Sequence, residues 1–180
     1  MLRTYTDSLH KYGNQYRLNK AVTDGNIVKI EAGIYSDSEN VQEIAVIAAK
    51  FPNAILTGDY AFYYHGLTDV VPEKYTLATR EKSYKLQDSR IHQTYVRDDL
   101  FEFGVETFIV DGCSVRIYDK ERMLIELLRQ KHALPYDYYK EILLNYRGII
   151  GQLQLWRIQE YANIFPKSKM IRKALDEEVL

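Results

Sequence analysis

Cysteine, proline and long apolar runs are all scarce in this sequence of 180 residues. The single cysteine, Cys113, excludes a disulfide framework and any cysteine-based zinc site, and it fits a reducing compartment. With 9 glycines and 4 prolines, collagen-like and low-complexity structures are excluded. No stretch approaches the roughly 18 apolar residues of a membrane-spanning helix, and the first residues lack the apolar core of a signal peptide. These absences predict a soluble, cytoplasmic protein without membrane contact.

The chain also has almost no net charge, because 24 Lys and Arg stand against 25 Asp and Glu. A global basic field that holds nucleic acid non-specifically is therefore excluded, and any such binding needs a local surface. The four histidines are scattered without the spacing of metal ligands, so we expect no metal and no cofactor. Hydrophobic residues make up 46%, which is enough to bury a core and excludes chain-wide disorder.

Helical and strand patterns are largely segregated along the chain, which predicts an α+β fold. Apolar spacing predicts helices over about 6–12, 15–24, 40–51, 59–65, 119–131, 135–146, 151–163 and 167–178, and strands over about 27–30, 34–35, 54–56, 74–79, 91–96, 105–110 and 113–118. Asp111-Gly112 predicts a tight hairpin turn, since both residues tolerate positive φ. Asn40 and Glu43 have the spacing of a capping box. We expect a minimal winged helix-turn-helix over residues 1–36, then a mixed α/β domain over 37–180 that ends in a helical tail from about residue 119.

The expected winged unit supplies the candidate DNA-binding residues. Asn14 is a good N-cap for the helix over 15–24, which turns Leu18 inward. The polar face of this helix could enter the major groove, and the hairpin could lie along the DNA backbone. The candidate residues are Gln15, Arg17, Asn19 and Lys20 for base edges and phosphates, and Lys29 for a phosphate. Residues 1–35 have a net charge of +2, and they also fit a small helical cap whose polar residues are merely solvated.

Catalytic alternatives find little support. Asp98-Asp99 and the run 176–178 are adjacent carboxylates, which do not converge on one metal when they lie in a helix. Asp59 and His65 could meet only if their helix bends. The basic stretch 80–97 fits a solvated loop, or a basic surface for nucleic acid or an acidic partner. The tyrosine-rich segments fit a core rim or an interface. We therefore expect no enzymatic activity.

Three segments together resemble a known family. Residues 25–35 read GNIVKIEAGIY, similar to the wing pattern G-x-[LI]-x-[RK]-[LIV]-x-x-G-[VI]-Y of AbiEi-type antitoxins. Residues 54–67 read AILTGDYAFYYHGL, similar to that family's strand and small-residue helix ending in H-G-L. The hairpin over 105–118 and the helix after Asp119 resemble the family's core segment. The order and spacing agree over about residues 14–130.

The resemblance implies a type IV toxin–antitoxin system. Its N-terminal winged unit is implied to bind operator DNA and repress the operon, and the rest to counteract a nucleotidyltransferase-like toxin without necessarily touching it. Two features depart from the family: no further helix precedes residue 6, and the wing tip is Glu31-Ala32 rather than basic. A shortened, less basic winged unit of this kind could bind DNA only as a homodimer, or not at all. The alternative is therefore a protein-interaction module of the same fold without DNA binding.

Overall fold

The computed structural model describes residues 1–179, and these divide into two compact units. The first unit holds Met1–Ala54 and Thr107–Arg116. The second holds Ile55–Glu106 and the chain from Ile117 onward. Residues 37–54 thus pack in the same unit as the N-terminal helices, and the domain boundary expected after residue 36 stays a prediction.

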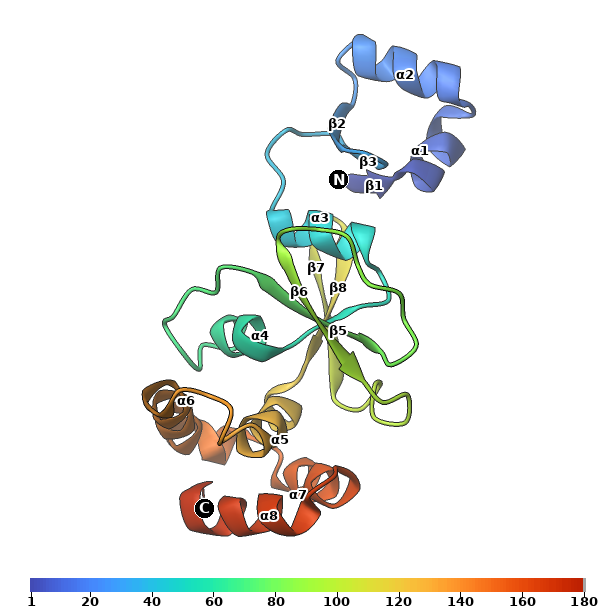
Figure 1. The fold of residues 1–180 in the computed structure, drawn as a ribbon. Helices are drawn as coiled ribbons and strands as arrows, with labels where there is room; N and C mark the ends of the chain where they lie inside the picture. The colour runs from blue at the N-terminus through green and yellow to red at the C-terminus, as the bar shows by residue number, and fades with distance from the viewer. Residues whose placement is uncertain (180) are drawn as a thin grey trace. The chain divides into compact units, whose positions relative to one another are not determined.

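The first unit begins with two helices beside a small sheet (Figure 1). Its elements are β1 (Leu2–Thr4), α1 (Tyr5–Tyr12), α2 (Gln15–Thr23), β2 (Val28–Glu31), β3 (Ile34–Ser36) and α3 (Glu43–Lys50). The sheet order is β1-β3-β2, and both pairings are antiparallel. Strand β1 was not expected, because three residues carry too little pattern and the strand is defined by its pairing with β3.

Local caps explain where the two N-terminal helices begin. Thr4 and Asp7 form a reciprocal capping box at α1. At α2 the Asn14 Oδ1 accepts from the Arg17 backbone N–H at 2.9 Å, which confirms Asn14 as the N-cap. Between the helices Gly13 has φ +87°, a conformation that favours glycine.

Two apolar clusters hold the first unit together. One joins Leu18, Ala21, Ile27 and Tyr35, so that α2 packs against the start of the hairpin. The other joins Leu2, Ile34, Ala45 and Val46, with Val110 and Cys113 packed against it. The capping box expected at Asn40 and Glu43 is wrong: Gln42 is the N-cap of α3 and makes no side-chain capping bond.

The strands of the larger sheet run in the order β6-β5-β4-β8-β7. Their bounds, with the helix between the first two, are β4 (Ile55–Leu56), α4 (Gly58–Tyr64), β5 (Tyr75–Arg80), β6 (Ile91–Val96), β7 (Val105–Val110) and β8 (Cys113–Tyr118). Strand β4 pairs antiparallel with β5 and parallel with β8, whereas β5 and β6 are parallel. Asp111 and Gly112 have φ of +50° and +83°, which confirms the expected tight turn.

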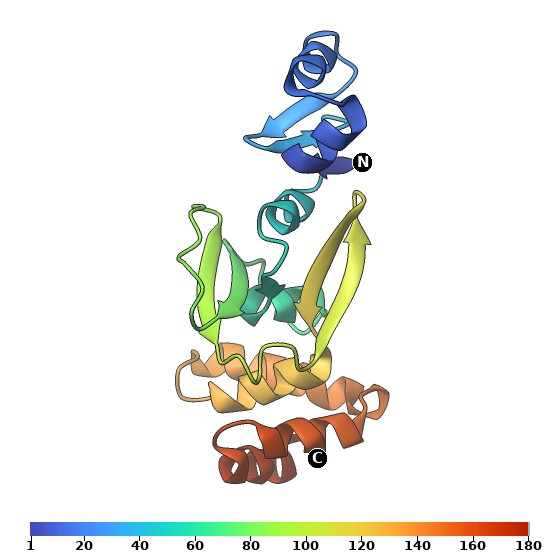
Figure 2. The ribbon, with the colours of Figure 1, turned by 90° about the vertical axis from the view of Figure 1, so that its right-hand side faces the viewer.

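The second unit ends in helices that gather into one group, orange to red in Figure 2. They are α5 (Lys120–Arg129), α6 (Tyr136–Ile149), the 3₁₀ turn η1 (Ile150–Gln152), α7 (Leu155–Ile164), α8 (Ser168–Ala174) and the π-helical turn η2 (Leu175–Val179). Helix α5 contacts α6, α7 and α8 and is the centre of the group. The α+β class is confirmed. No helix formed by residues 1–179 combines the length and apolar character that crossing a membrane requires.

Asp119 starts α5 and is a deeply buried carboxylate of the second unit. It is 1% exposed, and its Oδ1 accepts from the Arg122 backbone N–H at 2.6 Å. Its Oδ2 lies 3.2 Å from the Tyr161 hydroxyl and 3.3 Å from Arg157 Nη1. Burial is the dominant influence and raises the pKa of Asp119 to about 6, against the lowering effect of the bonds from Arg122 and Tyr161.

This raised pKa makes stability fall as pH rises. Between pH about 4, where an unfolded aspartate ionises, and about 6, the folded state holds the proton and the unfolded state does not. The contribution of this group to the free energy of unfolding should drop by about 2 kcal/mol across that window. Asp119→Asn keeps a capping oxygen and should flatten this slope. Urea unfolding of both proteins at several pH values checks it, and an unchanged slope in the variant would contradict the assignment.

Candidate nucleic-acid interface

Helix α2 presents four of the predicted residues to solvent. Gln15, Arg17, Asn19 and Lys20 are all exposed, while Leu18 between them is completely buried in the first apolar cluster. Helical periodicity therefore places the polar residues on the outer surface and anchors the helix by its apolar residues. The fifth, Lys29, is an exposed residue of strand β2.

Ion pairs neutralise the other basic residues of the first 36 positions. Arg3 donates to both carboxylate oxygens of Asp37 at 2.6 Å, and Lys11 Nζ lies 3.7 Å from the same carboxylate. The hydrogen bonds from Arg3 hold the pKa of Asp37 far below its usual range. At the end of strand β2 the Glu31 carboxylate is itself neutralised, because Lys50 Nζ lies 3.1 Å from its Oε2.

Three cations remain without such a partner. Within residues 1–179, no carboxylate lies at ion-pair distance from Arg17, Lys20 or Lys29. Of the acidic residues nearby, Asp7 caps α1 and Asp24 is exposed at the end of α2. The uncompensated positive charge of this segment therefore lies on the three cations that the sequence singled out.

Tyr16 is a further exposed residue of α2 and is not among the five predicted DNA-binding residues. It is 77% exposed and stands between Gln15 and Arg17. A tyrosine offers a flat apolar face and a hydroxyl, so it can stack on a sugar or base, or anchor a protein contact. The sequence could have indicated its exposure, because Tyr16 lies among the polar residues that precede Leu18.

The residues of the catalytic alternatives are engaged in other contacts. His65 Nε2 donates to the Tyr118 carbonyl oxygen at 2.7 Å, and burial lowers the pKa of this half-buried imidazole. The Asp59 carboxylate accepts instead from the Tyr138 hydroxyl at 3.1 Å. These two residues thus do not form an acid–base pair.

The two carboxylate clusters are likewise held in ion pairs. Asp99 lies 2.7 Å from Arg97, and Glu178 lies 2.5 Å from Lys131. Among the described residues, no group of three or more His, Cys, Asp or Glu side chains is arranged to hold a metal ion. Cys113 packs half-buried against the second apolar cluster, and burial raises the pKa of its thiol, which disfavours a reactive thiolate.

Comparison with protein-family models and with curated protein sequences finds no match to this chain.

Proposed function

We propose that the protein is a DNA-binding transcriptional autoregulator of AbiEi type, an antitoxin that represses its own operon and counteracts a nucleotidyltransferase-like toxin. The single observation that carries the DNA-binding role is the surface formed by α2 and Lys29. There Arg17, Lys20 and Lys29 are exposed and uncompensated, while the other basic residues nearby are paired. The resemblance of residues 25–35 and 54–67 carries the antitoxin role.

The arrangement of the first unit supports a minimal winged helix. Its chain order is β1-α1-α2-β2-β3, and the hairpin that follows α2 is closed by β1 on the other edge of β3. In this arrangement α2 takes the place of a recognition helix, and β2 with β3 takes that of the wing. Gln15 and Asn19 then reach base edges, while the three cations contact phosphates.

The salt dependence of binding reports how many such surfaces act together. Three phosphate contacts predict a slope of about −2.7 in log affinity against log salt, and a dimer that presents two surfaces doubles it. Between about 50 and 200 mM salt, affinity should fall about fortyfold for a monomer and roughly two-thousandfold for a dimer. The slope therefore distinguishes binding by one chain from binding by a pair.

Fluorescence anisotropy with the protein's own upstream DNA and a scrambled duplex of equal length tests the proposal. We expect tight binding to the upstream DNA, weak binding to the scrambled duplex, and the salt slope given above. Equal weak binding to both, or none, would refute the regulator. Co-expression with a nucleotidyltransferase-like neighbour, where the adjacent gene encodes one, tests the antitoxin role separately through restored growth.

The exposure of Tyr16 favours the second candidate, a protein-interaction module. Under this alternative α2 is an assembly surface, and Tyr16→Ala should lower the mass measured by size exclusion with light scattering. Deleting residues 1–36 would be a poor test, because Leu2 and Ile34 cover Ala45 and Val46 of α3. An unchanged mass in Tyr16→Ala, together with specific DNA binding, would dismiss the alternative.

A further inference from the structure

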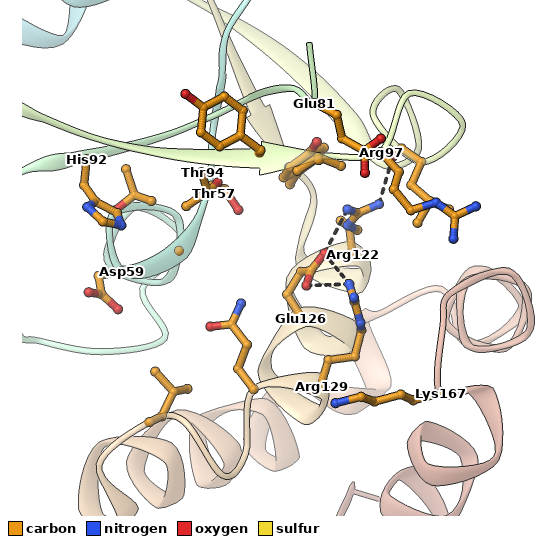
Figure 3. A pocket seen from close by; sticks show the side chains of 18 residues that line it. Thr57, Asp59, Glu81, His92, Thr94, Arg97, Arg122, Glu126, Arg129 and Lys167 are labelled. Carbon is orange, nitrogen blue, oxygen red and sulfur yellow. Dashed lines mark hydrogen bonds and ion pairs between the residues drawn. The ribbon is translucent and has the colours of Figure 1, made fainter. Parts of the chain in front are cut away.

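The second unit contains a cavity of about 460 Å³ that the DNA-binding proposal does not use. This size is in the range of small-molecule sites, which span roughly 300–1,000 Å³. Residues of α4, β5, β6 and α5 line it, together with Lys167 before α8. Figure 3 shows its lining residues: Arg122, Glu126, Arg129 and Lys167 lie toward one side, and Asp59 and His92 lie toward the other.

Two guanidinium groups share one carboxylate at the cationic side. Arg122 Nη2 lies 2.8 Å from Glu126 Oε1, and Arg129 Nη1 lies 2.9 Å from Glu126 Oε2. The three residues are spaced along one face of α5, at i, i+4 and i+7, so the helix itself brings them together. One negative charge is therefore opposed to two positive charges in this cluster.

Arg122 is held rigidly and is short of acceptors. It is 1% exposed, with its guanidinium carbon 3.9 Å from the ring centre of Phe165 and 4.5 Å from that of Tyr118. Its Nη1 donates to the Leu100 carbonyl oxygen at 3.0 Å. The buried Nε atoms of both Arg122 and Arg129 have no hydrogen-bond acceptor within residues 1–179.

A buried cation with unmet donors is unfavourable unless further negative charge compensates it. Burial lowers the pKa of Arg122, against the opposing effect of Glu126, in agreement with this shortage. An anion in the cavity would supply the missing charge.

Lys167 adds a third cation and sets the charge of the preferred anion. Its backbone has φ +68°, a left-handed conformation that is costly for lysine, and its side chain lines the cavity. Arg122, Arg129 and Lys167 against Glu126 leave a net charge of +2. The charges of Arg97 and Glu81, which also line the cavity, cancel each other. A phosphate monoester carries a charge of about −1.5 to −2 at neutral pH, which matches this net charge better than the single negative charge of a carboxylate does.

The other side of the cavity accommodates polar groups rather than a second anion. Asp59 is an exposed carboxylate there, and Thr57, Thr94 and His92 add further hydrogen-bonding atoms. Carboxylate and hydroxyl oxygens accept hydrogen bonds from ligand hydroxyl groups. We propose that the cavity binds a small phosphate monoester with a hydroxyl-bearing organic part, a sugar phosphate or a nucleoside monophosphate, whose phosphate lies at Arg129 and Lys167 beside the buried charge of Arg122.

Isothermal titration calorimetry of the full chain tests this site, with inorganic phosphate, ribose 5-phosphate and AMP as probes at constant ionic strength. At least one of the two monoesters should bind tenfold or more tightly than inorganic phosphate. Arg129→Gln and Lys167→Gln should each weaken that binding at least tenfold. The matched control Lys169→Gln removes an exposed charge of α8 that does not line the cavity, and it should bind as the unchanged protein does.

Asp59→Asn separates the two ends of the ligand. It should weaken the monoester severalfold and leave inorganic phosphate unaffected, because Asp59 lies away from the cationic side. Circular dichroism of each variant confirms that it is folded. Binding of none of the probes, phosphate binding as tight as both monoesters, or equal weakening by Lys169→Gln would each overturn the proposal. None of these outcomes depends on DNA binding.

Discussion

Replacing Arg17 and Lys20 together by glutamate should abolish binding to the upstream DNA and leave the protein folded. Both side chains are exposed on α2 and make no ion pair within the described chain, so their replacement removes no packing. Exposed substitutions of this kind usually change stability by no more than about 0.5 kcal/mol. The loss of two phosphate contacts, with repulsion in their place, should weaken binding by about a hundredfold or more at low salt.

The control for this experiment carries the same charge change elsewhere. Lys140 and Lys169 are exposed residues of the second unit, and Lys140→Glu with Lys169→Glu alters the net charge equally. Anisotropy should show near-normal affinity for this control, and the thermal unfolding of both double variants should match that of the unchanged protein. If a folded Arg17→Glu, Lys20→Glu protein still binds, or if the control loses binding equally, α2 is not the DNA-binding surface.

Gly104→Ala should be among the most destabilising single changes in the second unit. Gly104 has φ +69°, which costs a residue with a Cβ about 1 to 2 kcal/mol. An added Cβ would also lie 2.6 Å from Arg122 Cβ, closer than atoms can pack, and 3.0 Å from Asp119 Oδ1, tighter than most such contacts. Forcing extra atoms into a packed core costs about 1 to 3 kcal/mol more. We expect the midpoint of thermal unfolding to fall by roughly 6 to 15 °C.

Gly66→Ala isolates the steric part of this effect. Gly66 lies in the same unit with the same φ of +69°, but an added Cβ there meets nothing within 4 Å. It should therefore lose only the conformational part and lower the midpoint by about 3 to 6 °C. Equal losses in the two variants would mean that the start of α5 yields to the added methyl group.

Strong local signals predicted most of the elements. Asn14 starts α2 and Asp119 starts α5, each through a side-chain oxygen that accepts a backbone N–H of its own helix. The turn at Asp111-Gly112 depends on the backbone preferences of those two residues. The capping box expected at Asn40 and Glu43 did not form, because the spacing of the two residues permits such a bond without requiring it. The helix begins after Gln42 instead.

Periodicity also located the proposed DNA-binding residues, though not their electrostatic setting. The alternation of Gln15, Arg17, Asn19 and Lys20 with Leu18 and Ala21 determines which residues of the helix face outward. The pairing of Arg3 with Asp37, 34 positions away, and of Glu31 with Lys50 could not be inferred from spacing. Those ion pairs decide which basic side chains remain available to bind DNA.

The sequence by itself determined the α+β class, the starts of α2 and α5, the turn at Asp111-Gly112 and the outward residues of α2, because all of these depend on interactions within a few residues. The tertiary structure alone decided that β1 pairs with β3 and that β4 joins β5 to β8. It also decided that Phe165 packs on Arg122 and that Lys167 lines the same cavity as Arg122. The physical reason is the range of the forces. Caps and turns are short-range preferences of the backbone, whereas strand pairing and the compensation of buried charge depend on residues brought together only when the whole core forms.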